Sequence, residues 1–342
     1  MPEGHTVHRL ARTLGGLFGG QALRVSSPQG RFAAGADLLD GATLVAAEAW
    51  GKHLFLGFER SGPSLGPGGT ATALWLRVHL GLYGAWTFAG DGSADVVHAI
   101  GAPRRRIGER DSVPADVPGH RARADDAAGE WVAPEPRGAV RVRLLGPHAV
   151  ADLTGPAACE VVDDEEKARV EDRLGPDPIR DDGGRSSLAD ARDDFVARVR
   201  RSRVAVGQQL MDQGVVAGVG NIYRAEALFR AGIDPLRPGR DVAADALAGL
   251  WDDLVVLMRD GARTGAIVTT RAEHRDGPAV VDDPAGRRRT RQNTDGSPDA
   301  VPPEDAFYVY HRDGLPCRVC GAPVLTKELA ARNLFWCGAC QG

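Results

Sequence analysis

The stretch that decides the fold is Val215–Pro235, VVAGVGNIYRAEALFRAGIDP. Gly218 and Gly220 permit a tight turn, because glycine adopts positive φ without steric cost. Asn221 follows as a suitable N-cap, and a helix of about ten residues should run to Gly232, a residue type that commonly ends helices. The stretch therefore predicts a glycine-rich turn that leads directly into a helix.

A shorter helix is predicted just upstream, in VGQQLMDQ (206–213). Two helices joined by a glycine-rich turn present backbone N–H groups and the positive end of a helix dipole, and this arrangement binds anions such as phosphate. The same pattern also fits an ordinary helix pair with a glycine turn. The turn chemistry alone leaves both interpretations open.

Four of the five cysteines follow the pattern C-x2-C-x16-C-x2-C, namely Cys317, Cys320, Cys337 and Cys340. This spacing is typical of a zinc ion held by four thiolates, and the intervening residues can form a β-hairpin. Four thiolates fill the coordination shell, so the site should be structural rather than catalytic. The fifth cysteine, Cys159, lies in an apolar context that favours a buried thiol.

The rest of the chain divides by its patterning. Strand-like apolar runs extend from Leu23 to about Phe88 and recur in AVRVRLLGPHAVADL, and helical periodicity takes over after the turn-rich stretch GPDPIRDDGGRSS. In the last long helix, one apolar stripe is expected to contain Val242, Leu247, Leu250, Leu254 and Leu257. We predict an N-terminal domain at 1–174 with a loop insertion at about 90–138, a linker at 175–190, a helical domain at 191–303 and a zinc finger at 304–342.

Composition limits the function classes only loosely. The chain has 342 residues, 43% of them hydrophobic, and its net charge is −4. No run approaches the ~20 apolar residues that span a bilayer, so we expect a cytoplasmic protein without a membrane partner. Residues 151–200 hold 14 acidic and 8 basic residues, which masks a near-neutral remainder. Net charge therefore neither requires nor forbids a DNA-binding face.

Five motifs occur together in one order: MPEG at the N-terminus, the lysine of GKHL, HLGLYGAW, GVGNIY, and a four-cysteine finger that begins YHRDGLPC and ends WCGACQG. Together they resemble the formamidopyrimidine-DNA glycosylase and endonuclease VIII family. The finger and the Leu-Tyr of HLGLYGAW favour the endonuclease VIII branch, and MPEGHT, in place of MPEGPE, suggests an actinobacterial-type subgroup. The resemblance does not extend to the 90–138 insertion or to the acidic stretch.

The resemblance implies an α+β multidomain fold. Its parts would be an N-terminal β-sandwich and a C-terminal helix–two-turn–helix domain with a four-cysteine zinc finger. It also implies a partner, damaged double-stranded DNA, which would lie in the cleft between the two domains. We expect a monomer that associates with the nucleoid when it acts on DNA.

The implied catalytic residues are Pro2, Glu3 and Lys52. Removal of Met1 would leave Pro2 with a free secondary amine that attacks C1′ of the sugar and forms an iminium. An α-amino group has a pKa near 8, so roughly a tenth of it is neutral at pH 7. Glu3 would move protons, and Lys52 would contact phosphate and assist proton transfer, although a solvated surface lysine is its alternative.

Four further residues would contact DNA. Asn221 with its neighbouring N–H groups resembles a phosphate clamp, and Arg332 resembles the arginine that grips a phosphate beside the lesion. Leu82 and Tyr83 resemble wedge residues that fill the space left by a flipped base, with core packing as the alternative.

The expected reaction is removal of oxidised pyrimidines through the Pro2 Schiff base, followed by strand cleavage by β,δ-elimination. The first alternative keeps this chemistry with a preference for oxidised purines, because the segment 264–306 departs from the usual length and could change base selection. The second alternative is a catalytically weak protein that binds damaged DNA.

Overall fold

The computed structural model describes residues 2–60, 73–93, 99–101, 131–275, 290–291, 300–301 and 303–342. Most of the predicted 90–138 insertion, and 276–289 and 292–299 of the long segment 264–306, lie outside these described residues. The chain forms two compact units. One contains Pro2 and Thr6–Asp172, and the other contains Glu3–His5 and Arg173–Gly342.

Within the described residues, the first unit is built from two antiparallel sheets and three helices. The five-stranded sheet has the order β1-β7-β8-β5-β6 and the four-stranded sheet has the order β2-β3-β4-β9. The elements are α1 (Gly4–Phe18), β1 (Arg24–Ser26), α2 (Ala33–Leu39), β2 (Thr43–Trp50), β3 (His53–Glu59), β4 (Leu74–His79), β5 (Ala85–Gly90), β6 (Ala99–Gly101), β7 (Val140–Leu145), β8 (Ala149–Thr154), β9 (Ala158–Val162) and α3 (Asp164–Glu171).

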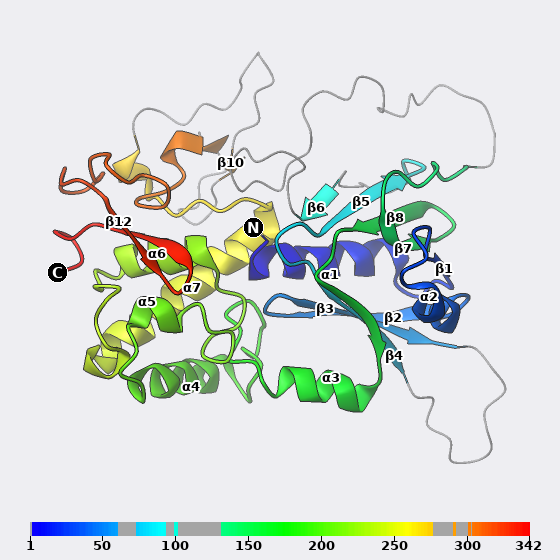
Figure 1. Cartoon of the computed structure of the whole chain (residues 1–342), viewed down its shortest axis with the longest axis horizontal. Coiled ribbons are helices and arrows are strands. Elements are labelled where there is room, and N and C mark those ends of the chain that lie inside the picture. The colour runs from blue at the N-terminus through cyan, green and yellow to red at the C-terminus, as the bar shows by residue number, and fades with distance from the viewer. Residues whose placement is uncertain are drawn as a thin grey trace. The chain divides into compact units, whose positions relative to one another are not determined.

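Helix α1 lies between the two sheets (Figure 1). Its apolar residues recur every three or four positions and are fully buried, as the helical period requires: Val7, Leu10, Leu14 and Phe18. They share one core with inward-facing residues of both sheets, such as Leu56 and Trp86. The alternation in β7 is equally regular, since Val140, Val142 and Leu144 are buried and the residues between them are not. The predicted N-terminal β-sandwich is therefore confirmed, with a helix between its layers.

The second unit is mainly helical. Its elements are α4 (Leu188–Arg200), α5 (Val206–Gln209), α6 (Asn221–Arg230), α7 (Ala244–Thr264), short 3-10 turns at Gly239–Asp241, Ala272–His274 and Pro303–Asp305, the strand pair β10 (Thr290–Arg291) with β11 (Ala300–Val301), and the hairpin β12 (Leu325–Leu329) with β13 (Arg332–Trp336). Among the described helices, none combines the length and the low charge that crossing a membrane demands.

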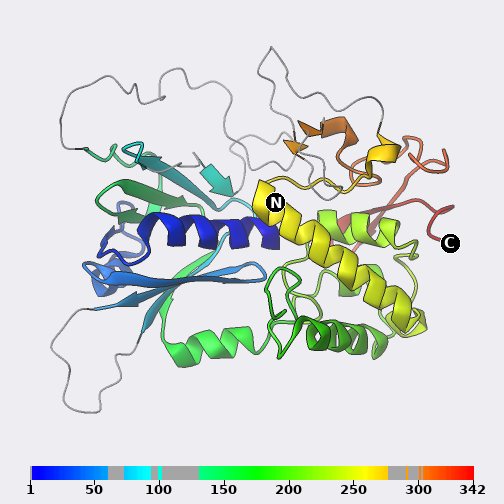
Figure 2. The ribbon, with the colours of Figure 1, turned by 180° about the vertical axis from the view of Figure 1, so that it is seen from behind.

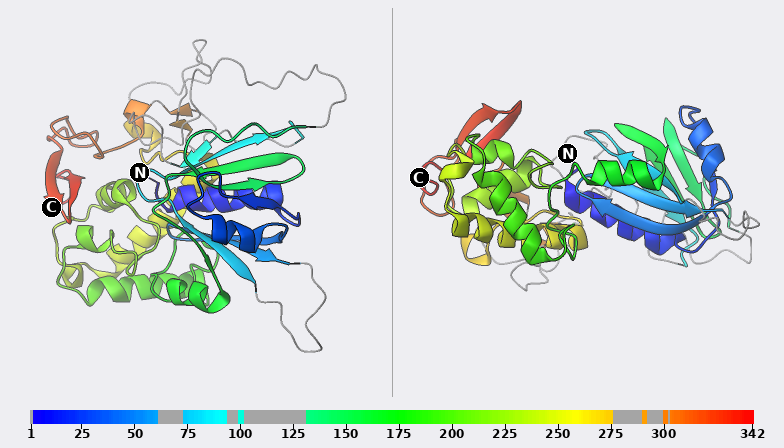
Figure 3. Two further views of the ribbon diagram at one scale, coloured as in Figure 1. Left: turned by 45° about the vertical axis from the view of Figure 1, so that its right-hand side comes forward. Right: turned by 90° about the horizontal axis from the view of Figure 1, so that it is seen from below.

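Helix α7 crosses α4 and α6 and covers the core of this unit (Figure 2). The stripe predicted from the sequence is confirmed: Leu247, Leu250, Leu254 and Leu257 are buried, and Val242, just before the helix, is buried too. Trp251 and Met258 complete the apolar face. The hairpin β12–β13 runs beside the helices of the unit, with β13 against α6 (Figure 3).

The stretch 175–190, predicted as a linker, is part of the second unit. Asp177 is fully buried, and its carboxylate accepts a hydrogen bond from the backbone N–H of Ile179 at 2.8 Å. The backbone carbonyl of Pro176 accepts from Ala217 N–H at 2.9 Å. The polar, turn-rich composition here reflects tight turns that are bonded into the fold.

Candidate active site

The glycine-rich turn before α6 holds a carboxylate from the start of the chain. Both oxygens of Glu3 accept hydrogen bonds, one from the backbone N–H of Gly220 and the other from that of Ile222, each at 2.8 Å. Glu3 is fully buried. An anion was expected at this helix N-terminus, because its first N–H groups have no partner within the helix. In the structure that anion is the protein's own Glu3 rather than a phosphate.

This arrangement corrects the predicted cap. Gly220, with φ −126°, is the N-cap residue, and Asn221 is the first residue of the helix. No side chain of the N-cap bonds to the helix, because glycine has none, and the Glu3 carboxylate takes that part instead. The prediction put the N-cap one residue too late, at Asn221, because asparagine is a residue type that favours caps.

Three glycines allow the close approach. Gly4 N–H donates to the carbonyl of Gly218 at 2.8 Å, and a Cβ on Gly4 would lie 2.7 Å from the Cα of Gly218. A Cβ on Gly220 would lie 2.4 Å from the carboxyl carbon of Glu3. Gly218 has φ +88°, as predicted, whereas Gly220 does not have positive φ. Gly220 is therefore required by space, and Gly218 by conformation.

Asn221 ties α6 to the hairpin of the predicted finger. Its Nδ2 donates to the backbone carbonyl of Asn333 at 3.0 Å, and its Oδ1 accepts from Nη2 of Arg224. The same Nη2 of Arg224 donates to Asn333 O at 3.1 Å. Asn221 is only 8% exposed, so its side chain is committed to this connection.

Arg224 is a buried cation that the sequence analysis missed. It is fully buried, and burial lowers its pKa to about 10, while the negative charge of Glu3 opposes that shift. The guanidinium therefore stays charged at neutral pH. The apolar periodicity of α6 did not indicate that Arg224 faces inward.

Arg332 begins β13 and is exposed. It pairs with Leu329 across a two-residue turn, Ala330–Ala331, in which both residues have positive φ, +54° and +56°. Positive φ at both central positions is the geometry of a type I′ hairpin turn, which usually takes Asn or Gly. Two alanines adopt it here at a steric cost, immediately before Arg332.

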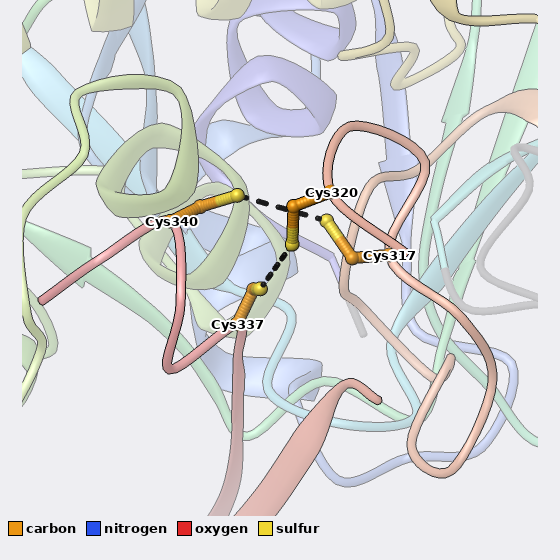
Figure 4. Close-up of side chains that lie close together, drawn as sticks. All are labelled: Cys317, Cys320, Cys337 and Cys340. Carbon is orange, nitrogen blue, oxygen red and sulfur yellow. Dashed lines mark hydrogen bonds between the residues drawn. The ribbon is translucent and has the colours of Figure 1, made fainter. Parts of the chain in front are cut away.

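The four cysteines come together as predicted (Figure 4). Their Sγ atoms all lie within 4.8 Å of one another, with 3.9 Å between Cys317 and Cys340 and 3.4 Å between Cys320 and Cys337. A tetrahedral zinc ion with Zn–S bonds of ~2.3 Å needs sulfurs at about this spacing. The four residues fit one structural zinc.

Gln341 and Glu226 fix the finger to the helical unit. Gln341 accepts from Cys337 N–H and donates to the carbonyl of Ile233, both at 2.9 Å. Glu226 in α6 is fully buried and accepts from three consecutive backbone N–H groups at 2.8 Å, those of residues 308, 309 and 310. Burial raises the pKa of Glu226, and these hydrogen bonds oppose that rise.

Lys52 lies in the first unit, in the two-residue turn between β2 and β3. Trp50 pairs with His53 across this turn, and Gly51 has φ +58°. Glycine at the first central position is typical of a type II′ hairpin turn, so the backbone of Lys52 is fixed by its neighbour. Lys52 is half-buried.

Leu82 and Tyr83 lie in the turn between β4 and β5. They are 43% and 69% exposed, so the core-packing interpretation does not hold for them. Gly81, with φ +66°, opens the turn. Large apolar side chains at an exposed turn are available to contact a partner.

Three family models match the chain: the formamidopyrimidine-DNA glycosylase N-terminal domain at residues 1–120, the formamidopyrimidine-DNA glycosylase H2TH domain at 174–273, and the zinc finger found in FPG and IleRS at 314–342. The fold and the zinc site thus define a DNA glycosylase with a helix–two-turn–helix domain. The chain belongs to the formamidopyrimidine-DNA glycosylase and endonuclease VIII family of DNA repair enzymes, as its motifs predicted.

Two relatives illustrate the match. "Endonuclease 8 1" of Mycobacterium tuberculosis is 41% identical over 341 residues and is covered, like this chain, over its full length. Formamidopyrimidine-DNA glycosylase of Thermus thermophilus is 32% identical over 170 residues, which cover 50% of this chain and 54% of the relative.

Solved structures share the fold. The MutM (Fpg) protein of Thermus thermophilus has a TM-score of 0.61 at 23% identity, with 99% of this chain and 98% of that chain covered. Fpg of Lactococcus lactis, in a complex with DNA that contains an oxidised pyrimidine, has a TM-score of 0.64 at 16% identity, with 99% of each chain covered.

Within the second unit, the structure brings Glu3, Asn221 and the finger hairpin that carries Arg332 into one bonded assembly. Lys52, Leu82 and Tyr83 belong to the first unit, at the ends of its strands. Arg224 and Glu226 were missed as site residues, and Gly220 was expected only as a turn residue. The charged pair in RAEALF is a signal that could have drawn attention to residues 224 and 226, but the apolar period does not show that they face inward.

Proposed function

We propose that the protein is a bifunctional DNA glycosylase and abasic-site lyase that removes oxidised pyrimidines from damaged double-stranded DNA. The observation that carries this proposal is the fixed position of Glu3, whose two oxygens are held by Gly220 and Ile222 one residue after Pro2. A chain terminus is normally mobile. Here the residue next to the proposed nucleophile is buried and bonded, so the terminus is preorganised for chemistry.

After removal of Met1, the Pro2 nitrogen is a secondary amine. Its lone pair attacks C1′ of the damaged nucleotide, the glycosidic bond breaks, and the base leaves with a proton. Opening of the sugar ring gives an iminium between Pro2 and C1′. This cation draws electrons from C2′, so loss of a C2′ proton expels the 3′ phosphate, and a second elimination expels the 5′ phosphate.

Glu3 acts as the proton carrier in these steps. The Glu3 carboxylate can take the proton that the Pro2 nitrogen loses after its attack, and the resulting acid can protonate the ring oxygen as the sugar opens. The carboxylate that this step regenerates then accepts the C2′ proton. The two N–H groups at the start of α6 fix its orientation and stabilise its negative charge, as a helix N-terminus does. Zinc takes no part in the reaction, because four thiolates complete its shell and leave no open position.

Lys52 and Arg332 supply positive charge for DNA phosphates, one from a tight turn and the other from a hairpin tip. Asn221 aligns that hairpin through its bond to Asn333. Leu82 and Tyr83, exposed at their turn, enter the base stack when the damaged nucleotide is flipped. The protein acts as a monomer on nucleoid DNA.

Borohydride trapping tests the mechanism, because reduction of the iminium leaves a covalent protein–DNA adduct. Full-length, zinc-loaded protein should give this adduct with abasic duplex DNA. Pro2→Gly, or protein that retains Met1, should give much less. Full trapping by protein that retains Met1 would refute the role of the Pro2 nitrogen, and no trapping by the native protein would favour a DNA-binding protein without catalysis.

Lesion preference is tested with the same assay on matched duplexes. We expect faster cleavage of DNA that contains 5-hydroxyuracil than of DNA that contains 8-oxoguanine. The full-length relatives carry the name "Endonuclease 8 1", and the resemblance to the endonuclease VIII branch is the reason for expecting pyrimidine lesions. A reversed order would establish the oxidised-purine alternative while leaving the lyase chemistry intact.

A further inference from the structure

A row of polar side chains crosses the sheet face next to Lys52. In the four-stranded sheet, His53 of β3 is paired with His79 of β4, and Arg77 of β4 is paired with Glu160 of β9. Because side chains alternate along a strand, residues 53, 77, 79 and 160 share one face of the sheet. His53 directly follows Lys52, so the row ends at the turn that carries the lysine.

These side chains are connected in a defined order. Nη1 of Arg77 pairs with the Glu160 carboxylate. Nε and Nη2 of Arg77 lie 3.3 Å and 3.2 Å from Nδ1 of His53. A guanidinium has donors only, so Nδ1 of His53 must be the acceptor and carries no proton. The remaining ring nitrogen, Nε2, then holds the proton of the neutral ring.

We propose that Arg77 and Glu160 are positioning residues that hold the His53 ring neutral, with its proton on Nε2, beside Lys52. Glu160 orients the guanidinium, the guanidinium fixes the tautomer of His53, and the His53 ring packs against that of His79 at 5.0 Å between centroids. The His53 ring therefore adds no charge beside Lys52 over the pH range in which free histidine titrates. This inference rests on the proposed function only in assigning DNA chemistry to Lys52.

Burial and the basic groups around His53 all lower its pKa. Burial is the largest cause that lowers its pKa, to about 3, followed by the nearby His79, Arg77 and Lys52. The pKa of His79 is lowered as well, first by burial and then by Lys52 and Arg77. Glu160, on the neighbouring strand β9, is the acidic residue of this row, and it forms an ion pair with Arg77. Farther along the sheet, Lys167 of α3 is paired with Glu48 and Glu171.

Nuclear magnetic resonance of the histidine rings tests the proposal without any use of activity. Long-range 15N–1H spectra of the full-length, zinc-loaded protein should show His53 with the proton on Nε2 and without titration between pH 5 and 8. His53→Gln assigns the signal. In Arg77→Met, which keeps the side-chain stem but removes the donors and the positive charge, the pKa of His53 should rise by about two units or more, to about 5 or above. A native ring that carries its proton on Nδ1, or that titrates near pH 6.5, would overturn the proposal.

A kinetic experiment then tests whether this row of side chains affects DNA binding at Lys52. Abasic-strand cleavage by Arg77→Met should show a change of threefold or more in the ratio of KM at pH 5.5 to KM at pH 7.5, because a new positive charge forms on His53 in acid. The change should disappear in the double variant Arg77→Met/His53→Gln. If it persists there, His53 is not the group that responds.

Glu160→Gln is the second variant, because Glu160 is about half exposed and its replacement should not threaten folding. We expect the 15N shift of His53 Nδ1 to change as the guanidinium loses its orientation, without the rise in pKa expected for Arg77→Met, because removal of a negative charge does not favour the protonated ring. An unchanged spectrum would show that Glu160 does not orient Arg77. If the native protein cleaves no DNA, the proposed function fails, while the ring spectra still decide the positioning of His53.

Discussion

A Cβ atom on Gly220 would lie 2.4 Å from the carboxyl carbon of Glu3, although 217 positions separate the two residues in the chain. The position before α6 thus has no room for a side chain, because a residue from the start of the chain occupies the space. The same backbone donates its N–H to that carboxylate at 2.8 Å. Glu3 can therefore occupy this position only if residue 220 is a glycine.

Gly220→Ala should therefore displace Glu3. We expect a loss of about 1–3 kcal/mol in the free energy of unfolding, as is usual when a well-packed site is overfilled. Borohydride trapping should fall at least tenfold, because the carboxylate next to Pro2 moves. Denaturant unfolding and trapping on abasic DNA measure the two effects.

Gly249→Ala is the matched control. Gly249 is exposed inside helix α7, and a Cβ there meets nothing within 4 Å. Alanine should stabilise the helix by ~0.5–1 kcal/mol and leave trapping unchanged. If both alanines behave alike, the contact between Gly220 and Glu3 does not constrain the active site.

Glu3→Gln separates placement from chemistry. The amide offers one acceptor oxygen, so Gly220 N–H or Ile222 N–H loses its partner, and we expect a cost of about 1–2 kcal/mol in the free energy of unfolding. Binding to DNA with a non-cleavable abasic analogue should fall less than threefold, while trapping falls at least a hundredfold. Equal losses in binding and trapping would show that Glu3 serves only to place the terminus.

The sequence was sufficient for the features that depend on local chemistry. The cysteine spacing predicted the zinc site, and the apolar period of residues 247–257 predicted the buried face of α7. Each of these depends on residues close together in the chain, so a pattern of residue types is enough to find them.

The sequence was insufficient where a distant residue completes the local structure. Asn221 was expected to cap α6, and the side chain at that helix start is instead Glu3. The inward turn of Arg224 and Glu226 depends on the backbone of residues 308–310 and 333, which no local period reveals. Such contacts require tertiary coordinates.

Arg332→Ala should weaken DNA binding without changing the fold, because Arg332 is exposed at the tip of its hairpin. The slope of log K against log salt should decrease by ~1, as expected when one phosphate contact is lost. Binding titrations at several salt concentrations measure the slope, and circular dichroism checks the fold. Arg332→Lys should restore the slope but only part of the affinity, since lysine lacks the fork of a guanidinium. An unchanged slope in the alanine variant would exclude a phosphate contact.

Cys337→Ser should disorder the β12–β13 hairpin while the helices of the second unit stay folded. Cys337 is buried, and its N–H bonds to Gln341, so loss of the zinc releases both the cluster and this connection. Amide exchange should become fast in residues 325–336 and stay slow in α7. A chelator should reproduce the effect in the native protein, and a native protein that keeps full DNA affinity without zinc would contradict the structural role.

Ala331→Gly should stabilise the hairpin, because residue 331 has φ +56° and glycine adopts this conformation without strain. We expect a gain of roughly 0.5–1 kcal/mol, less than the full left-handed penalty because glycine also loses more entropy on folding. Ala248→Gly, within helix α7, should instead destabilise by about 1 kcal/mol. Local amide exchange in residues 325–336 measures the first effect. Destabilisation by both glycines would mean that the Ala330–Ala331 turn does not hold positive φ in solution.

The lowered pKa of His53 makes the first unit sensitive to acid. The ring has a pKa of about 3 when folded and 6.5 when unfolded, so below pH 6.5 the unfolded chain binds a proton that the folded chain does not. Stability therefore falls as pH decreases, with a slope that approaches about 1.4 kcal/mol per unit, or by roughly 2 kcal/mol between pH 7 and pH 5. His79, whose pKa is also lowered, acts in the same direction. A variant at position 53 keeps His79, so the contribution of His79 cancels when the variant is compared with the native protein.

His53→Gln removes the titrating group but keeps an acceptor for Arg77, so the variant should lose less stability than the native protein over the same range. Urea unfolding at pH 7 and pH 5, followed by tryptophan fluorescence, to which the buried Trp75 and Trp86 of the first unit contribute, measures the difference. The native protein should lose about 2 kcal/mol more than the variant, since only the native unfolded chain gains that proton. Equal losses would mean that His53 keeps an ordinary pKa in the fold, and Arg77 would then not hold its ring neutral.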